Sequence, residues 1–233
     1  MGKVRTILLQ KGVFDDNDAE AQRLRGELEE EGTFLINVMS SPGAGKTTTL
    51  VSLINRLKSY LKIGVMEADI DYDIDAVRVA DKTGCKSIQL HTGGMCHLDA
   101  DMTMQGIDEL GVDGLDVVFL ENVGNLVCPA EFDTGAHLNV IIASVPEGDD
   151  KPLKYPLAYS NSQLVILNKM DSAPYFTFDR DAFYRNVRMR NRDAEIIPIS
   201  AKTGENVSSV TEYLRQKISD FKENEKCPNK TTK

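Results

Sequence analysis

The sequence predicts an α/β fold, with a mostly parallel sheet and helices on both faces. Three observations support this prediction. From Thr33 onward, short apolar runs alternate with segments of helical periodicity. A glycine-rich turn joins the first of these runs to the helix that follows it. Two later apolar runs, 163–167 and 195–199, are each followed by a short polar motif.

The predicted elements follow the chain in order. Leu24 and Leu28 lie four residues apart and give the first helix a thin apolar stripe, and Gly32 ends that helix. Strands are expected at 34–39, 63–66, 87–90, 116–120, 139–145, 163–167 and 195–199, and helices at 15–31, 47–58, from about 76 to 82, 98–110 and 207–222. We expect a helical N-terminal extension over 1–31, one core domain over 32–222 and a disordered tail over 223–233.

Length and composition restrict the class of protein. A chain of 233 residues fits one large domain, and an apolar share of 41% is enough for a substantial core. The net charge of −9 argues against a nucleic-acid partner. No apolar run approaches the roughly 18 residues that a membrane span needs, and Ile7–Leu9 is too short for a signal-peptide core. We therefore expect a cytoplasmic protein that neither spans a membrane nor binds nucleic acid.

A glycine-rich turn follows the apolar run 34–39, where residues 40–47 read Ser-Ser-Pro-Gly-Ala-Gly-Lys-Thr. A loop that wraps phosphates needs glycines so that backbone N–H groups point inward, a lysine for the phosphate charge and a hydroxyl for Mg²⁺. Ser40 stands where the usual pattern has glycine, and a chance Gly-Lys-Thr is the alternative. The strand–loop–helix setting favours a P-loop nucleotidase. The expected ligands are Gly43, Ala44, Gly45, Lys46, Thr47 and Thr48, and Lys46 is also expected to be catalytic.

Acidic residues near strand ends are candidates for Mg²⁺ and for catalysis. Glu121 ends the run 117–121, and residues 121–124 have the acid-x-x-Gly spacing of a γ-phosphate sensor, with Glu where most GTPases have Asp. Asp69 follows the second strand and is a further candidate to hold Mg²⁺ or orient the attacking water. Asp71 and Asp73 fit a solvated acidic loop better.

Two motifs near the C-terminal strands predict a guanine site. Residues 168–171 read Asn-Lys-Met-Asp, and 200–202 read Ser-Ala-Lys. A carboxylate at the fourth tetrad position accepts two hydrogen bonds that guanine offers and adenine does not. The asparagine would brace the loop, the lysine would lie over the base, and the Ala201 N–H would point at O6. We expect GTP as the nucleotide, bound by Asn168, Lys169, Asp171, Ser200, Ala201 and Lys202.

Cysteine and histidine side chains near the expected γ-phosphate sensor suggest a metal. Cys96 and His97 are expected to open the helix that leads into the strand ending at Glu121, and Cys128 follows Glu121 by seven residues. Thiolate and imidazole ligands suit Zn²⁺ or Ni²⁺. The alternative, equally compatible with the spacing, is that both cysteines fill the core and His97 caps the helix. Cys85, Cys227, His91 and His137 match no motif, and core or surface roles are expected for them.

Four segments together carry a resemblance to a known family: 40–48, 96–100, 121–129 (Glu-Asn-Val-Gly-Asn-Leu-Val-Cys-Pro) and 146–156. They closely resemble the HypB family of hydrogenase nickel-incorporation GTPases, of the SIMIBI class of P-loop GTPases, over about 32–214. The resemblance implies a slow, regulatory GTPase that loads nickel into [NiFe] hydrogenase. It also implies a homodimer linked to GTP, with Cys96, His97 and Cys128 binding Ni²⁺ or Zn²⁺ at its interface. Lys154 would approach the partner subunit's nucleotide.

The implied protein partners are a second maturation factor and the hydrogenase large subunit. Two other functions stay open at this point. One is a related metallochaperone GTPase of the urease or cobalamin-enzyme type, although urease accessory GTPases place a proline between Cys and His, whereas here Cys96 and His97 are adjacent. The other is a non-catalytic nickel store or shuttle in which GTP only stabilises the fold.

Overall fold

A single parallel sheet forms the centre of the molecule. The computed structural model describes residues 4–9, 17–69 and 74–225. Within them, eight strands pair in the order β1-β4-β3-β5-β2-β6-β7-β8, all parallel. Their bounds are β1 Arg5–Leu8, β2 Phe34–Ser40, β3 Ile63–Asp69, β4 Lys86–His91, β5 Val117–Glu121, β6 Leu138–Ser144, β7 Leu164–Asn168 and β8 Glu195–Pro198. The predicted parallel sheet is confirmed.

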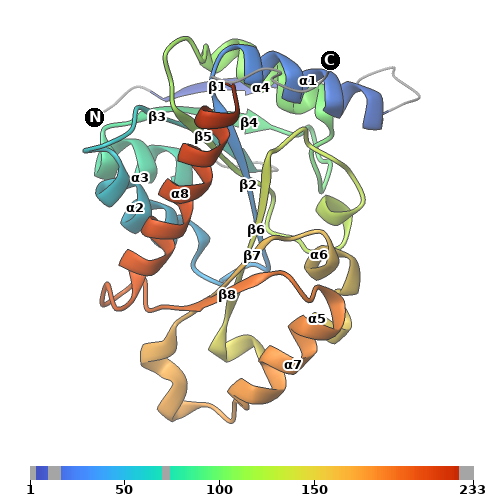
Figure 1. The fold of residues 1–233 in the computed structure, drawn as a ribbon, viewed down its shortest axis with the longest axis vertical. Coiled ribbons are helices and arrows are strands. Elements are labelled where there is room, and N and C mark those ends of the chain that lie inside the picture. The colour runs from blue at the N-terminus through green and yellow to red at the C-terminus, as the bar shows by residue number, and fades with distance from the viewer. Residues whose placement is uncertain (1–3, 10–16, 70–73, 226–233) are drawn as a thin grey trace, which may run out of the picture.

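Helices cover both faces of this sheet (Figure 1). One face carries α2, α3 and α8, and the other carries α1 and α4 over one half and α6 and α7 over the other half. The helix bounds are α1 Asn17–Glu30, α2 Lys46–Leu57, α3 Ile74–Thr83, α4 Ala100–Leu110, α5 Lys151–Lys154, α6 Pro156–Ser160, α7 Arg180–Arg190 and α8 Val207–Glu225, with short 3-10 turns η1 Cys128–Ala130, η2 Val145–Glu147 and η3 Met170–Tyr175. The strands are therefore buried between two layers, as their apolar sequences require.

Strand side chains alternate between the two faces of the sheet, one of which carries one apolar cluster and the other two. On β2, Ile36 and Val38 pack under α2 and α8, whereas Leu35 faces the α1 and α4 layer and Met39 the α6 and α7 layer. Asn37 also points to this second face, between the two apolar clusters, and it is 2% exposed. A buried amide in mid-strand needs hydrogen-bond partners, and the other polar residues beside it supply them.

The structure adds elements that the sequence did not predict. β1 is an edge strand of the sheet and pairs with β4, and α7 lies between η3 and β8. α7 is mostly polar, but Phe183 and Val187 lie four residues apart and are both buried. α4 begins at Ala100 rather than at 98, because the side chain of Asp99 caps it by accepting a hydrogen bond from the Met102 N–H.

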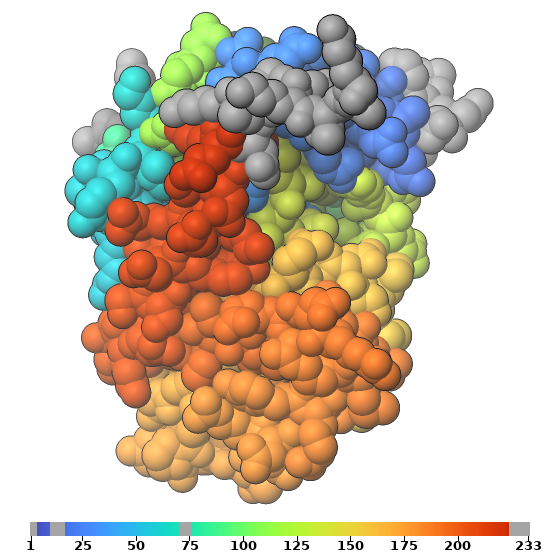
Figure 2. Space-filling view, viewed as in Figure 1, coloured from blue at the N-terminus to red at the C-terminus, as the bar shows by residue number. Residues whose placement is uncertain are grey.

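Two boundaries also differ from the predictions. The pair 96–97 does not open α4 and lies in the loop before it, which corrects that expectation. α8 extends through Glu225, three residues beyond its predicted end at Lys222. The space-filling view shows α8 across one face of the molecule and the segment that contains α7 at its lower end (Figure 2). Among the described helices, none has the length and apolar character that crossing a membrane requires.

Candidate nucleotide and metal site

The phosphate loop lies at the carboxyl end of β2, between β2 and α2, as predicted. Gly43 and Gly45 have φ angles of +78° and +94°, which place them in the left-handed region. A Cβ at Gly45 would lie 2.6 Å from the side-chain nitrogen of Asn168, so only glycine fits there. Gly43 is thus required for its backbone conformation, and Gly45 both for its conformation and because a larger side chain would collide with Asn168.

A cavity of about 480 Å³ opens beside this loop. Its lining comes from the carboxyl ends of three neighbouring strands and from two helices, so the predicted phosphate-binding and acidic residues meet at one site. The lining residues are Ser40, Ser41, Pro42, Gly43, Gly45, Lys46, Thr47, Thr48, Glu67, Ala68, Asp69, Arg78, Glu121, Val123 and Gly124.

Glu121 is joined to both reactive side chains of the loop. The Thr47 hydroxyl donates to Glu121 Oε1 at 3.1 Å, and Lys46 Nζ lies 3.8 Å from the same oxygen. Glu121 is 3% exposed, and its Oε2 finds no hydrogen-bond partner among the described residues. A buried carboxylate oxygen beside a threonine hydroxyl provides hard oxygen ligands, so these two residues fit Mg²⁺.

Two residues of this cavity were not predicted from the sequence. Glu67 lies opposite Glu121 in the β3–β5 register and is 3% exposed, and Arg78 reaches the cavity from α3. Strand alternation from Asp69 offered a signal for Glu67, since residues two apart on a strand share a face. Arg78 had no local signal. Asp71 and Asp73 lie outside the described residues.

The predicted guanine site is a second cavity, of about 550 Å³, on the other side of the phosphate loop. Its lining residues are Gly45, Thr48, Pro146, Asn168, Lys169, Asp171, Ser172, Ala201 and Lys202. Asn168 braces it as expected, because its side chain donates to the Ala44 carbonyl at 3.0 Å and accepts from the Ala201 N–H at 3.0 Å. One buried amide therefore connects the phosphate loop to both of the predicted guanine loops.

The remaining contacts of this site refine the predicted roles. The Ser200 hydroxyl donates to Asp171 Oδ1 at 2.7 Å, which fixes the carboxylate's orientation. The Ala201 N–H is taken up by Asn168, so in this structure it does not point freely toward a base, contrary to the prediction. Lys169 Nζ reaches back to the Gly43 carbonyl, and its stem lines the cavity. Pro146, from η2, is a lining residue that the sequence did not indicate.

The three predicted metal ligands are only partly brought together. Cys96 and Cys128 lie within hydrogen-bond reach, and this contact, with burial, raises the pKa of the Cys96 thiol. His97 instead stacks on Phe132, and its Nδ1 is buried without a partner in the described part of the chain. Across residues 4–9, 17–69 and 74–225, no three His, Cys, Asp or Glu side chains are arranged to hold a metal.

The other predicted residues lie away from this thiol pair. Lys154 on α5 pairs with Asp150 at 2.6 Å on the surface, and this hydrogen bond raises the pKa of Lys154. His137 has a core role, as expected: it stacks on Phe34, and burial lowers its pKa to about 4. Cys85 packs against the core on the sheet face that α2, α3 and α8 cover, and Cys227 lies outside the described residues.

Comparison with known proteins gives a consistent result. Residues 34–198 match the family model described as CobW/HypB/UreG, nucleotide-binding domain. The hydrogenase maturation factor HypB of Rhizobium leguminosarum bv. viciae is 41% identical over 214 residues, which is 92% of this chain and 71% of that protein. The crystal structure of HypB from Helicobacter pylori in complex with nickel has a TM-score of 0.83 and 36% identity, and covers 88% of this chain and 95% of that one.

A second solved structure agrees with this result. The structure of the hydrogenase maturation factor HypB from Archaeoglobus fulgidus has a TM-score of 0.81 at 33% identity, and covers 88% of this chain and 100% of that one. The P-loop, the acid-x-x-Gly turn and the Asn-Lys-x-Asp tetrad all lie at the carboxyl edge of the parallel sheet. The chain therefore belongs to the CobW/HypB/UreG nucleotide-binding family and, within it, to the HypB hydrogenase maturation factors of the SIMIBI class of P-loop GTPases.

Proposed function

We propose that this protein binds and slowly hydrolyses GTP in order to control the delivery of nickel to [NiFe] hydrogenase. The observation that carries the proposal is the brace at Asn168, which bonds to the phosphate loop through Ala44 and to the second guanine loop through Ala201. A site that holds both ends of one nucleotide in a fixed relation suits a guanine nucleotide with its phosphates in the 480 Å³ cavity.

Different side chains of this chain would bind the phosphates, the Mg²⁺ ion and the attacking water. Lys46 binds the β- and γ-phosphates, and the Thr47 hydroxyl with Glu121 would hold Mg²⁺, which neutralises phosphate charge when it is bound. Asp69 lines the same cavity and orients the attacking water. At the other end, Asp171 accepts hydrogen bonds from guanine, and Ser200 keeps that carboxylate in place.

The proposed nickel site begins with the thiol pair Cys96 and Cys128. Two thiolates and the nearby His97 form a donor set that suits Ni²⁺ or Zn²⁺. Because one chain does not complete a cluster in its described residues, a homodimer that brings two thiol pairs together supplies the missing ligands. The solved H. pylori relative with nickel supports nickel as cargo. Lys154, exposed on α5, would approach the partner's nucleotide.

Hydrolysis acts as the switch in this proposal. GTP favours the dimer that holds the metal, and hydrolysis loosens it so that nickel passes to the hydrogenase large subunit with the help of a second maturation factor. Such coupling requires that the metal bind one nucleotide state better than the other.

A metal titration tests the proposal. Wild type, Cys96→Ala and the matched control Cys85→Ala are titrated with Ni²⁺ or Zn²⁺, each with GDP and with a non-hydrolysable GTP analogue, and read by sizing and metal content. We expect wild type and Cys85→Ala to bind metal differently in the two states, and Cys96→Ala to lose that metal. Equal metal binding by Cys96→Ala would refute the site.

GTP turnover separates this function from a non-catalytic store. We expect slow turnover in wild type that disappears in Lys46→Ala, because the lysine contacts the transferred phosphate. Turnover that persists in Lys46→Ala would contradict the catalytic role. The adjacent Cys96 and His97 remain the feature that separates this chain from the urease-type arrangement.

A further inference from the structure

A line of asparagine amides, buried at Asn37 and Asn122 and more open at Asn139, crosses the second face of the sheet and connects two parts of the site. Asn122 Nδ2 donates to Asn37 Oδ1 at 3.0 Å, and Asn37 Nδ2 donates to Asn139 Oδ1 at 2.9 Å. Asn139 Nδ2 then donates to the Asn161 carbonyl at 3.3 Å. All three bonds point in one direction, an arrangement in which each bond polarises and strengthens the next.

One end of this line touches the phosphate site. Asn122 directly follows Glu121, and its carbonyl accepts a hydrogen bond from Lys46 Nζ. Its side-chain Oδ1 accepts from the Val123 N–H at 2.9 Å, so its amide holds the turn beside the phosphate cavity. A γ-phosphate that attracts Lys46 would take this lysine away from the Asn122 carbonyl.

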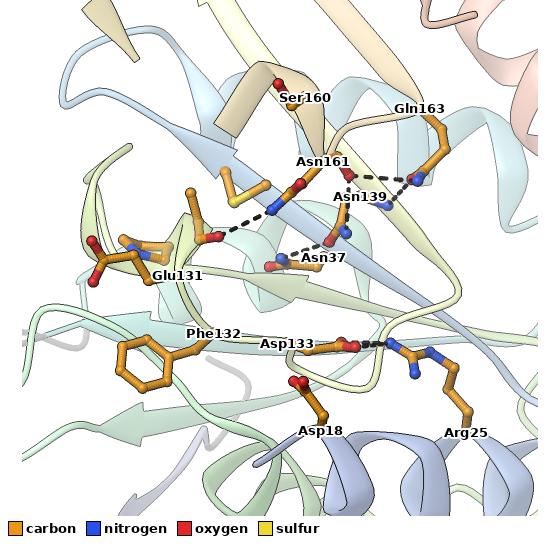
Figure 3. A pocket seen from close by; sticks show the side chains of 13 residues that line it. Asp18, Arg25, Asn37, Glu131, Phe132, Asp133, Asn139, Ser160, Asn161 and Gln163 are labelled. Atoms are coloured by element: carbon orange, nitrogen blue, oxygen red, sulfur yellow. Dashed lines mark hydrogen bonds and ion pairs between the residues drawn. The ribbon is translucent and has the colours of Figure 1, made fainter. Parts of the chain in front are cut away.

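The other end touches the turn that carries Cys128. Asn161 Nδ2 donates to the Ala130 carbonyl at 3.1 Å, and Ala130 closes the 3-10 turn η1, Cys128–Ala130. Figure 3 shows Asn37, Asn139, Asn161 and Gln163 together on one side of a cavity that Glu131 and Phe132 also line.

This cavity, of about 460 Å³, is lined by every residue of the loop 129–133, in which Pro129 and Ala130 are buried and Glu131 is exposed. The two ends of this loop are tied, one by the Asn161–Ala130 hydrogen bond and the other by the ion pair of Arg25 with Asp133 (Figure 3). Between these ties Phe132 stacks on His97, and the loop borders the open space of the cavity, so movement of one tie can shift the residues beside it. The tie at Ala130 is the one that the line of amides controls.

We propose that Asn37 and Asn139 are positioning residues that transmit the nucleotide state from Asn122 to the Cys128 turn. This inference rests on the proposed function, because it names the route by which GTP alters metal binding. Neither residue touches the nucleotide or the metal ligands. Their substitution should therefore leave each ligand able to bind and should reduce only the dependence of one on the other.

The test removes both amides at once. Asn37→Leu combined with Asn139→Leu replaces two mutually bonded polar groups by apolar groups of similar size, and it leaves Asn122 Nδ2 as the one buried donor of the line without its acceptor. The control is Asn186→Leu, which removes a partly buried amide on α7 that bonds to the Asp149 carbonyl and to no residue of the line. For each protein, Ni²⁺ affinity is measured with GDP and with a non-hydrolysable GTP analogue.

We expect wild type and Asn186→Leu to show the same ratio of the two affinities, within the range of about 5- to 150-fold typical of coupled sites. The double variant should bring the ratio to within about twofold of one. The reciprocal measurement, GTP-analogue affinity with and without Ni²⁺, must change by the same factor. A merely structural role would instead weaken Ni²⁺ binding in both nucleotide states and leave the ratio near its wild-type value.

The results separate the two levels of the proposal. A double variant that keeps the wild-type ratio overturns the relay and leaves the proposed function intact, whereas a wild-type ratio of one overturns both. If the double variant does not fold, Asn161→Ser gives the same information, because Asn161 is exposed and the change removes only its bond to Ala130. A retained ratio in Asn161→Ser likewise overturns the relay.

Discussion

The imidazole of His97 stacks face to face on the ring of Phe132, with centroids 4.0 Å apart and planes 6° apart. Phe132 belongs to the loop that also carries Cys128, so the stack links the loop before α4 to the Cys128 loop. With its Nδ1 buried, His97 is held in the stack rather than in a ligand cluster with the two thiols. The stack thus holds His97, one of the three predicted metal ligands, away from the thiol pair.

We expect Phe132→Leu to tighten nickel binding, because it frees His97 to turn toward the thiol pair. Aromatic stacks contribute about 0.5–1.5 kcal/mol, which corresponds to a gain of roughly 2- to 12-fold in affinity. Nickel titration of the wild type, the single variants and the double variant with His97→Ala gives a thermodynamic cycle. The explanation fails if Phe132→Leu has the same effect when His97 is absent.

The two glycines of the phosphate loop should respond differently to alanine. Both changes place a side chain at positive φ, which costs about 1–2 kcal/mol. Gly45→Ala also drives a Cβ to within 2.6 Å of Asn168, whereas at Gly43 nothing lies within 4 Å. We expect thermal unfolding to show a clearly larger loss of stability for Gly45→Ala. Equal losses of stability would mean that the Asn168 side chain moves aside for the new Cβ without lowering the free energy of unfolding.

Asp171→Asn should change the base that is bound. The substitution exchanges a carboxylate acceptor for an amide that also donates, so preference should move from GTP toward XTP. Competition binding with the two nucleotides measures the change, and Asp193→Asn, on an exposed loop, serves as the control. An unchanged base preference would remove Asp171 from the guanine site.

Glu121→Gln should abolish the dependence of turnover on Mg²⁺. The substitution keeps the shape of the side chain and its contact with Thr47, but removes the negative charge that a divalent cation needs. We expect GTP turnover to fall by at least about 100-fold while nucleotide binding without Mg²⁺ persists. Turnover assays across a Mg²⁺ series distinguish these effects, and a normal Mg²⁺ response in the variant would exclude Glu121 as a ligand.

His137 predicts how stability depends on pH. The folded protein lowers its pKa to about 4 from the ordinary 6.5, chiefly through burial, and the Leu35 N–H donates to its Nδ1 at 2.9 Å. Below pH 6.5 the unfolded chain takes up a proton that the folded chain refuses. The contribution of His137 to the free energy of unfolding is thus fully present above pH 6.5. As the pH falls from 6.5 to 4, this contribution decreases by about 1.4 kcal/mol for each pH unit.

Denaturant unfolding of wild type and His137→Gln between pH 4 and 8 checks this expectation. The variant is expected to be less stable at pH 8, because it loses the ring stack with Phe34, but its stability should fall less steeply from pH 6.5 to 4. Parallel pH profiles would assign the acid sensitivity to other groups.

Local motifs explain how much of this site was predictable. The loop at Gly43 and Gly45 and the tetrad at Asn168 are short and carry their chemistry within a few residues, so their place at strand ends followed directly from the pattern of apolar runs. The contact between Cys96 and Cys128 joins segments separated by a strand and a helix, and the sequence offered it only as one of two alternatives. The amide line depends on register between strands, which no local pattern specifies.

Elements at the edge and surface were missed for a different reason. β1 is only four residues long, and α7 is mostly polar and buries only Phe183 and Val187. In both, tertiary packing decides the structure and the sequence signal is weak.

The brace at Asn168 also limits how this protein can be altered. Since the same amide bonds to the phosphate loop at Ala44 and to the second guanine loop at Ala201, base choice and phosphate binding share a common support. Engineers or evolution can exchange Asp171 to accept another base, but a change at Asn168 must be compensated at three loops at once. Nucleotide specificity can therefore be redesigned at Asp171, the fourth tetrad position, but not by a substitution at Asn168, the first, alone.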